Sequence, residues 1–164
     1  MSQQDQLDME FGYDLIDNGT SDDYYTPPWL FKALKIEFDL DVCAPAGGVP
    51  WIPAKRSLSI IDDGLNTEWY GRVWMNPPYS SPTPWIDKFI EHSNGICLIA
   101  CSRSGSFYKL WDMADAFMGL PMPLIKFITA NGESKGIFMP VILAAMGAKN
   151  VQAMRDSNLS RVRK

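Results

Sequence analysis

Apolar and polar residues recur along the chain with two different periods, which divide it into helices and strands. In YYTPPWLFKALKIEF the apolar residues follow Pro27 at helical spacing, and Pro27 fits a first helical turn, so we expect a helix over residues 27–37. FDLDVCA alternates apolar residues and predicts a strand over residues 38–44, which ends at the turn formers PAGGVP. Residues 45–71 show no clear period and predict a long connection of the kind that often carries function.

The second half of the chain predicts strands that are buried on both faces. RVWMN indicates a short apolar strand, PTPWIDKFIEHSNG a helix and GICLIAC a continuously apolar strand, an order that favours a parallel sheet. SFYKLWDMADAFM predicts a further helix. LIKFITA and IFMPVILAAMG predict a late antiparallel strand pair, joined by NGESKG, that extends the sheet. We therefore expect an α/β fold with a mostly parallel central sheet and helices on both faces.

Composition and charge divide the 164 residues into one domain and two ends. A hydrophobic fraction of 46% suffices for a single compact domain, which we place at residues 23–149. Residues 1–31 contain seven acidic residues and no Lys or Arg, and we expect an acidic, disordered arm over residues 1–22. The stretch 150–164 predicts a basic C-terminal tail. The net charge of -4 argues against tight, unspecific binding to nucleic acid.

The sequence lacks the residue patterns of a membrane span, a signal peptide, a metal site and a His-based nucleophile triad. No run of about 18 apolar residues is present, and the acidic start does not resemble a signal peptide, so we expect a cytoplasmic protein without a membrane partner. The three cysteines form no CxxC pair and His92 is the single histidine, so we expect neither a metal site nor a His-based nucleophile triad. The oligomeric state, monomer or dimer, stays open.

The stretch NPPY, directly after the apolar strand VWM, contains the most specific chemistry. In a doubly wound sheet, ligands bind at the carboxyl ends of the strands. Pro77 and Pro78 form a stiff turn whose carbonyls point outward, Asn76 adds a side-chain acceptor, and Tyr79 adds an aromatic face. These elements suit a planar base with an exocyclic amino group. A purely structural turn is the alternative, because Asn-Pro-Pro is itself a turn signal.

NPPY resembles motif IV of the amino-methyltransferases, in which Asp, Asn or Ser precedes Pro-Pro and an aromatic residue. TPPWLF resembles the Thr-Pro element before the first strand in the gamma class of adenine methyltransferases, and FDLDVCAP resembles their cofactor strand. With DDGLNTEWYGRVWMNPPYS, GICLIACSRSGSFYKLW and FITANGESKGIFMPVILAA, the order resembles the phage-type, Dam-like DNA N6-adenine methyltransferase family from residue 22 to about residue 147. The resemblance implies a Rossmann-like, S-adenosylmethionine-dependent methyltransferase fold.

The same resemblance implies the reaction and the roles of the NPPY residues. S-adenosylmethionine would be the methyl donor and adenine N6 in DNA the acceptor, with strict or loose sequence specificity. Asn76 and the Pro77 carbonyl would accept the two N6 hydrogens, and Tyr79 would stack on the adenine after it leaves the duplex. By analogy alone, a phage-encoded member would act in the host cytoplasm and serve restriction evasion.

Cofactor-binding residues are also implied by the resemblance. Asp41 would pair with the methionine ammonium, and Asp39 is the alternative on the same face of the strand. The glycines of AGGV are adjacent, where the usual motif separates them by one residue, and no second strand with a ribose-binding acid is evident. The further cofactor residues are Thr26 and Pro27 at the methionine end, Cys43 in the cofactor strand, and Asp63 at the cofactor's adenine amino group.

Basic residues in loops are candidates for DNA contact. Trp51 lies in a loop beside Lys55 and Arg56, and a basic loop with an aromatic residue suits DNA backbone and an unstacked base, with solvated charges as the alternative. Arg103 follows a predicted buried strand and suits a substrate phosphate or, equally, a structural ion pair. Sequence recognition would come from loops such as 45–62 or 130–136.

Three other functions are compatible with parts of the sequence. Protein glutamine N5-methyltransferases also use NPPY, but they resemble a cofactor strand with closely spaced glycines that this chain lacks. N4-cytosine methyltransferases usually begin the motif with Ser. A catalytically weak or inactive nucleic-acid-binding or cofactor-binding relative would fit a short, acidic chain, although the intact NPPY argues against it.

Overall fold

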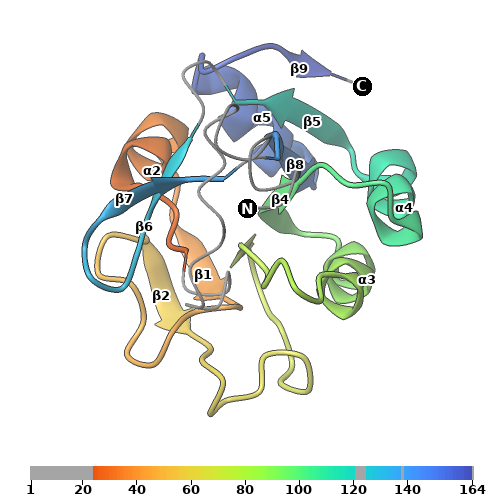
Figure 1. Cartoon of the computed structure of the whole chain (residues 1–164). Helices are drawn as coiled ribbons and strands as arrows, with labels where there is room; N and C mark the ends of the chain where they lie inside the picture. Colours follow the sequence, from red (N-terminus) through yellow and green to blue (C-terminus); the bar gives the residue numbers. More distant parts are fainter. Residues whose placement is uncertain (1–23, 121–124, 138, 164) are drawn as a thin grey trace, which may run out of the picture.

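A seven-stranded sheet forms the centre of the computed structural model, which describes residues 24–120, 125–137 and 139–163 (Figure 1). The spatial order is β2-β1-β3-β4-β8-β5-β9. Strands β2, β1, β3 and β4 are parallel to one another, β8 lies antiparallel between β4 and β5, and β9 is antiparallel to β5. The strands of this sheet are β1 (Phe38–Asp41), β2 (Ala54–Ser57), β3 (Val73–Met75), β4 (Gly95–Ala100), β5 (Ala116–Gly119), β8 (Val141–Met146) and β9 (Val162–Arg163).

Helices pack on both faces of this sheet, which confirms the expected α/β class (Figure 1). α3 and α4 contribute buried residues such as Phe89 and Leu110 to the apolar cluster on one face. α2 and α5 contribute residues such as Leu30 and Met154 to the cluster on the other face. No helix within the described residues is both long and apolar enough to cross a membrane. The helices are α2 (Pro28–Leu34), α3 (Thr83–His92), α4 (Gly105–Met113) and α5 (Ala148–Asp156).

Both segments expected to form the late antiparallel pair contain strands, β6 (Lys126–Ile128) and β8, but these two strands do not pair with each other. β6 pairs with β7 (Ser134–Gly136) in a separate two-stranded sheet. The long apolar run that follows forms β8 instead, and all six of its residues are buried inside the central sheet. A strand with neighbours on both sides and helices over both faces needs apolar residues throughout.

Two further stretches differ from the expected elements. The helix expected over residues 106–118 ends at Met113, and the last apolar residues of that range belong to β5. The sequence pattern did not separate the two elements, because a short buried strand and a helix end have similar patterns. The connection expected over residues 45–71 contains β2, which lies at the edge of the sheet and exposes Lys55 and Arg56, so it lacks a continuous apolar signal.

The structure describes most of the C-terminal end of the chain but not the N-terminal end. The expected acidic arm, residues 1–22, lies outside the described residues. Of the expected basic tail, much is packed in secondary structure: α5 buries Asn150 and Met154, and β9 pairs with β5.

The backbone of β1 is irregular next to Asp39, the first of its two acids. Asp39 N and Leu40 N both donate to the carbonyl oxygen of Arg72, at 2.7 and 3.4 Å. Phe38 and Leu40 are two positions apart but belong to apolar clusters on opposite faces, so side chains do not alternate regularly here. The expectation that Asp39 and Asp41 share one face assumed regular alternation, and it stays a prediction.

Candidate functional site

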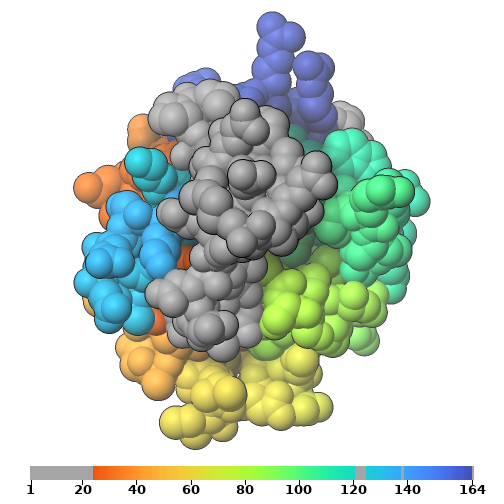
Figure 2. All heavy atoms as spheres, viewed as in Figure 1, coloured from red at the N-terminus to blue at the C-terminus, as the bar shows by residue number. Residues whose placement is uncertain are grey.

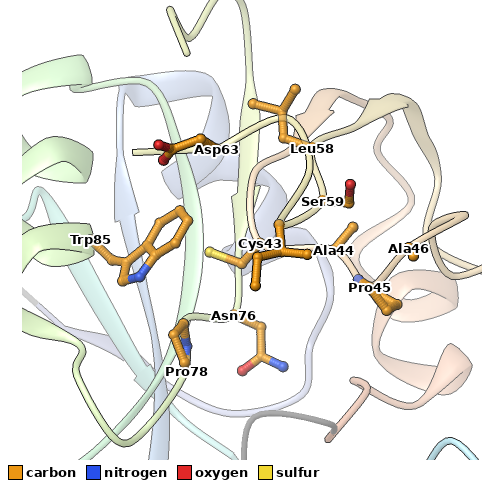
Figure 3. Close-up of a pocket in the computed structure, with 12 residues that line it drawn as sticks. Cys43, Ala44, Pro45, Ala46, Leu58, Ser59, Asp63, Asn76, Pro78 and Trp85 are labelled. Carbon is orange, nitrogen blue, oxygen red and sulfur yellow. The ribbon is translucent and has the colours of Figure 1, made fainter. Parts of the chain in front are cut away.

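A pocket of about 650 Å³ lies at the carboxyl ends of β1, β2 and β3 (Figure 3). This is the edge at which open α/β sheets bind ligands. The segment after β2, yellow in Figure 2, forms one border of the pocket and projects at the edge of the molecule. The lining residues are Cys43, Ala44, Pro45 and Ala46 after β1, Leu58, Ser59, Ile60, Asp63 and Gly64 after β2, Asn76 and Pro78 after β3, and Trp85 in α3.

Asn76 lines this pocket, and its two amide atoms differ in their hydrogen bonding (Figure 3). Its Nδ2 donates to the main-chain oxygen of Tyr24 at 2.9 Å. That oxygen can only accept, so the amide nitrogen must face it and the amide orientation is determined. The Oδ1 atom is buried and has no hydrogen-bond partner within the described residues. Since buried acceptors are nearly always satisfied, an unsatisfied one at a pocket points to a ligand that donates.

The other NPPY residues divide between two cavities. Pro78 lines the main pocket, whereas Tyr79 lines a separate cavity of about 40 Å³. The Tyr79 ring packs edge-on against Phe127, with centroids 6.2 Å apart. Its hydroxyl is buried and finds no partner in the described part of the chain, and burial raises the pKa of this phenol well above its ordinary value. The role of Tyr79 as a stacking surface for adenine stays a prediction.

Asp41 does not line the main pocket, but it contacts Cys43, which does. It ends β1, is 2% exposed, and accepts a hydrogen bond from Cys43 N at 3.4 Å. Burial raises the pKa of its carboxyl to about 7. Cys43 itself lines the pocket, and burial raises the pKa of its thiol. Asp39, the alternative to Asp41, instead forms an ion pair with Lys55 at 2.7 Å, outside this pocket, and these contacts lower the pKa of Asp39.

Thr26 and Pro27 precede α2 and are both buried. The Thr26 side-chain hydroxyl has no hydrogen-bond partner in the described ranges, and its main-chain oxygen accepts from the Trp51 indole nitrogen at 2.8 Å. Neither residue lines the main pocket, so their expected contact with a cofactor stays a prediction.

Asp63 is both a pocket residue and a turn residue. Its φ angle of 51° is left-handed, which Asp tolerates better than most residues. Its main-chain oxygen accepts from the nitrogens of Asn66 and Thr67, and its carboxylate accepts from Asn66 Nδ2 at 2.7 Å. This turn places the carboxylate at the mouth of the pocket.

Lys88 in α3 holds that turn in place, and its role was not expected from the sequence. Its ammonium donates to the main-chain oxygens of Gly64, Leu65 and Thr67, at 3.1, 2.7 and 2.5 Å, and lies 5.0 Å from the centre of the Trp69 ring. Partial burial lowers the pKa of Lys88. A lysine at a helical position usually indicates only a solvated face, so no sequence signal distinguished it.

The basic residues expected to contact DNA are not part of the pocket lining. Lys55 pairs with Asp39, and Arg56 lies 3.5 Å from Asp62. Arg103 is exposed in the segment before α4. Their contact with DNA stays a prediction, beside the ion pairs that two of them form.

A mostly parallel sheet with one inserted antiparallel strand, and an Asn-Pro-Pro-Tyr turn whose Asn76 and Pro78 line the pocket, are consistent with a methyltransferase fold. The model of the DNA N-6-adenine-methyltransferase (Dam) family matches residues 15–142, and the chain belongs to this family. It is also 37% identical over 73 residues to the DNA N-6-adenine-methyltransferase of Haemophilus phage HP1 (strain HP1c1). That match covers 42% of this chain and 40% of the phage protein, so the chain spans less than half of that relative. Membership of the family implies a methyl donor.

Proposed function

We propose that the protein transfers a methyl group from S-adenosylmethionine to the N6 amino group of an adenine in DNA. Family membership and the phage relative's name support the reaction class. The observation that carries the proposal is the buried, unpartnered Oδ1 of Asn76 beside the pocket, because an exocyclic amino group is a donor that would satisfy it.

Asn76 acts in this proposal by orientation and electrostatics. Its Oδ1, together with the Pro77 carbonyl, accepts hydrogens from N6 and so directs the nitrogen lone pair. As the nitrogen becomes cationic, the same preorganised acceptors stabilise the developing charge. A neutral amide is no base, so Asn76 holds the amino group without removing its proton, and water is the natural acceptor of that proton.

The pocket residues fit S-adenosylmethionine as the donor. A volume of about 650 Å³ is typical of a cofactor site. Leu58, Ile60 and Trp85 supply apolar walls suited to an adenine ring, and Asp63 supplies a carboxylate acceptor for an amino group. When bound, the donor supplies an electrophilic methyl group on a sulfonium. Asp41, which accepts from the backbone of the lining residue Cys43, is the acid that would balance the methionine ammonium.

The test supplies purified protein with methyl-labelled S-adenosylmethionine and unmethylated DNA, followed by digestion to nucleosides and mass spectrometry. We expect labelled N6-methyldeoxyadenosine. Label in cytosine or in added protein, or no transfer by protein that binds the donor, would contradict the proposal. The same DNA incubated with the labelled donor but without the protein gives the background.

A further inference from the structure

A second pocket of about 490 Å³ adjoins the main one and has no part in the proposed chemistry. It lies between the loop that follows β1 and the turn of the β6–β7 hairpin, which are neighbours in Figure 1. Pro45 and Ala46 line both pockets, so this short piece of the loop separates them. Whatever occupies the second pocket therefore lies next to the occupant of the first.

The lining of the second pocket suits an uncharged, planar ligand. None of the described residues that line it is charged. Tyr25, Val49, Trp51 and Ile128 provide aromatic and apolar surface. The indole nitrogen of Trp51 donates to Thr26 O at 2.8 Å, which holds the ring in place. Charged partners would strengthen binding of a phosphate or an amino-acid group, and this lining offers none, whereas a nucleobase needs mainly a flat surface on which to stack.

The wall of the second pocket is continuous with the support of Asn76. Tyr25 and Ile128 exchange two main-chain hydrogen bonds of 2.8 and 2.9 Å, which tie the segment before α2 to the hairpin. The next residue back, Tyr24, accepts from Asn76 Nδ2. A ligand in the second pocket would thus contact Tyr25, which is next in the chain to the residue whose backbone orients the amide of Asn76.

We propose that the second pocket, between the loop after β1 and the β6–β7 turn, binds by stacking a nucleobase adjacent to the target adenine in the DNA strand. The proposal rests on the proposed function for its ligand class, since a strand whose adenine lies at Asn76 continues past Pro45 and Ala46. The uncharged, aromatic lining then selects the neighbouring base over the phosphate.

Two tryptophan substitutions in the β6–β7 turn test this. Ala130 and Asn131 are consecutive and exposed, but only Ala130 lines the second pocket. We expect Ala130→Trp to weaken binding of a fluorescent oligonucleotide containing one adenine by about 10-fold, the order of one lost base stack, and Asn131→Trp to change it less than about 2-fold. Donor binding should be equal in both. Equal oligonucleotide affinities in the two variants would overturn the proposal.

Oligonucleotides with an abasic site on either side of the adenine locate the base. For the wild type, removal of one neighbouring base should weaken binding by about 10-fold, and Ala130→Trp should be indifferent to that removal. No sensitive neighbour position in the wild type would overturn the proposal. The binding readout needs no turnover, so absence of methylation would contradict the proposed function, while selective loss of binding in Ala130→Trp would still support the second pocket.

Discussion

The side-chain nitrogen of Asn76 donates to the main-chain oxygen of Tyr24, at 2.9 Å and across 52 positions of sequence. This bond determines which end of the amide points where. It leaves Oδ1, buried and without a partner among the residues described, as the atom that can accept from a substrate. The segment before the first helix therefore contributes to the site through its backbone.

Asn76→Asp replaces the donating nitrogen by an oxygen that faces the Tyr24 carbonyl. Two acceptors then oppose each other unless the carboxyl is protonated, so we expect methyl transfer at pH 8 to fall by at least about 10-fold and to recover partly as the pH is lowered toward 6. Initial rates measured against the wild type over this range test it. A pH-independent, wild-type rate would show that Tyr24 does not orient the side chain.

Lys88→Met removes three donations to the turn that carries Asp63. The released turn should weaken binding of S-adenosylhomocysteine, measured by calorimetry, by about 10-fold, since a hydrogen bond from a charged group contributes about 1.5–3 kcal/mol. Lys109→Met is the matched control, because Lys109 pairs with Asp87 on the surface, where such pairs contribute little. Equal affinities of the two variants for S-adenosylhomocysteine would show that Lys88 does not support the binding site.

Asp41→Asn tests the effect of burial on stability. Burial raises the pKa of Asp41 from 3.8 to about 7. Between these two pH values the Asp41 carboxyl keeps its proton in the folded protein but has lost it in the unfolded chain. Stability conferred by the wild-type residue is thus present at low pH and lost as the pH rises toward 7. Asn resembles the protonated acid. We expect the variant to match the wild type near pH 4 and to exceed its free energy of unfolding at pH 8 by a few kcal/mol. A difference that stays constant with pH in urea unfolding would refute this.

The same variant tests Asp41 as the partner of the donor's ammonium. An opposite charge favours the ionised carboxylate, so wild-type affinity for the donor should increase as the pH rises from 5.5 to 7.5. Asp41→Asn should bind more weakly and lose this dependence. Parallel pH profiles by calorimetry would place the ammonium elsewhere.

Tyr79→Phe removes a buried hydroxyl that lacks a partner in the part of the chain that the structure describes. Removal of an unsatisfied polar group costs little or stabilises, and Phe keeps the aromatic face. We expect an unchanged or higher melting temperature and methyl transfer within about 3-fold of the wild type. A large loss of transfer with intact stability would give the hydroxyl a catalytic role.

The sequence predicted those parts of the molecule that depend on local pattern. The strand VWM and the NPPY turn after it are contiguous, so Asn76 and Pro78 were expected at a strand end, and both line the pocket. The Tyr24 carbonyl was not foreseen, because every residue has such an oxygen and only tertiary pairing brings this one to Asn76. Likewise, nothing in the residue type of Lys88 indicates three main-chain acceptors.

Failures of the fold prediction have the same origin. β2 exposes Lys55 and Arg56 at the sheet edge, so it carries no apolar signal. The apolar residues of β5 continue the helical pattern of α4, so the pattern did not predict that the helix ends at Met113. The insertion of β8 between β4 and β5 depends on pairing between distant segments, which periodicity does not encode.

The central claim is that Asn76 acts on the acceptor amino group rather than on the donor. Its most direct test is Asn76→Ala, with N6-methyldeoxyadenosine formation and S-adenosylhomocysteine affinity measured on the same preparation. We predict a loss of transfer of at least about 100-fold with an unchanged dissociation constant for S-adenosylhomocysteine. Wild-type transfer, or a loss explained entirely by weaker binding of that ligand, would contradict the account.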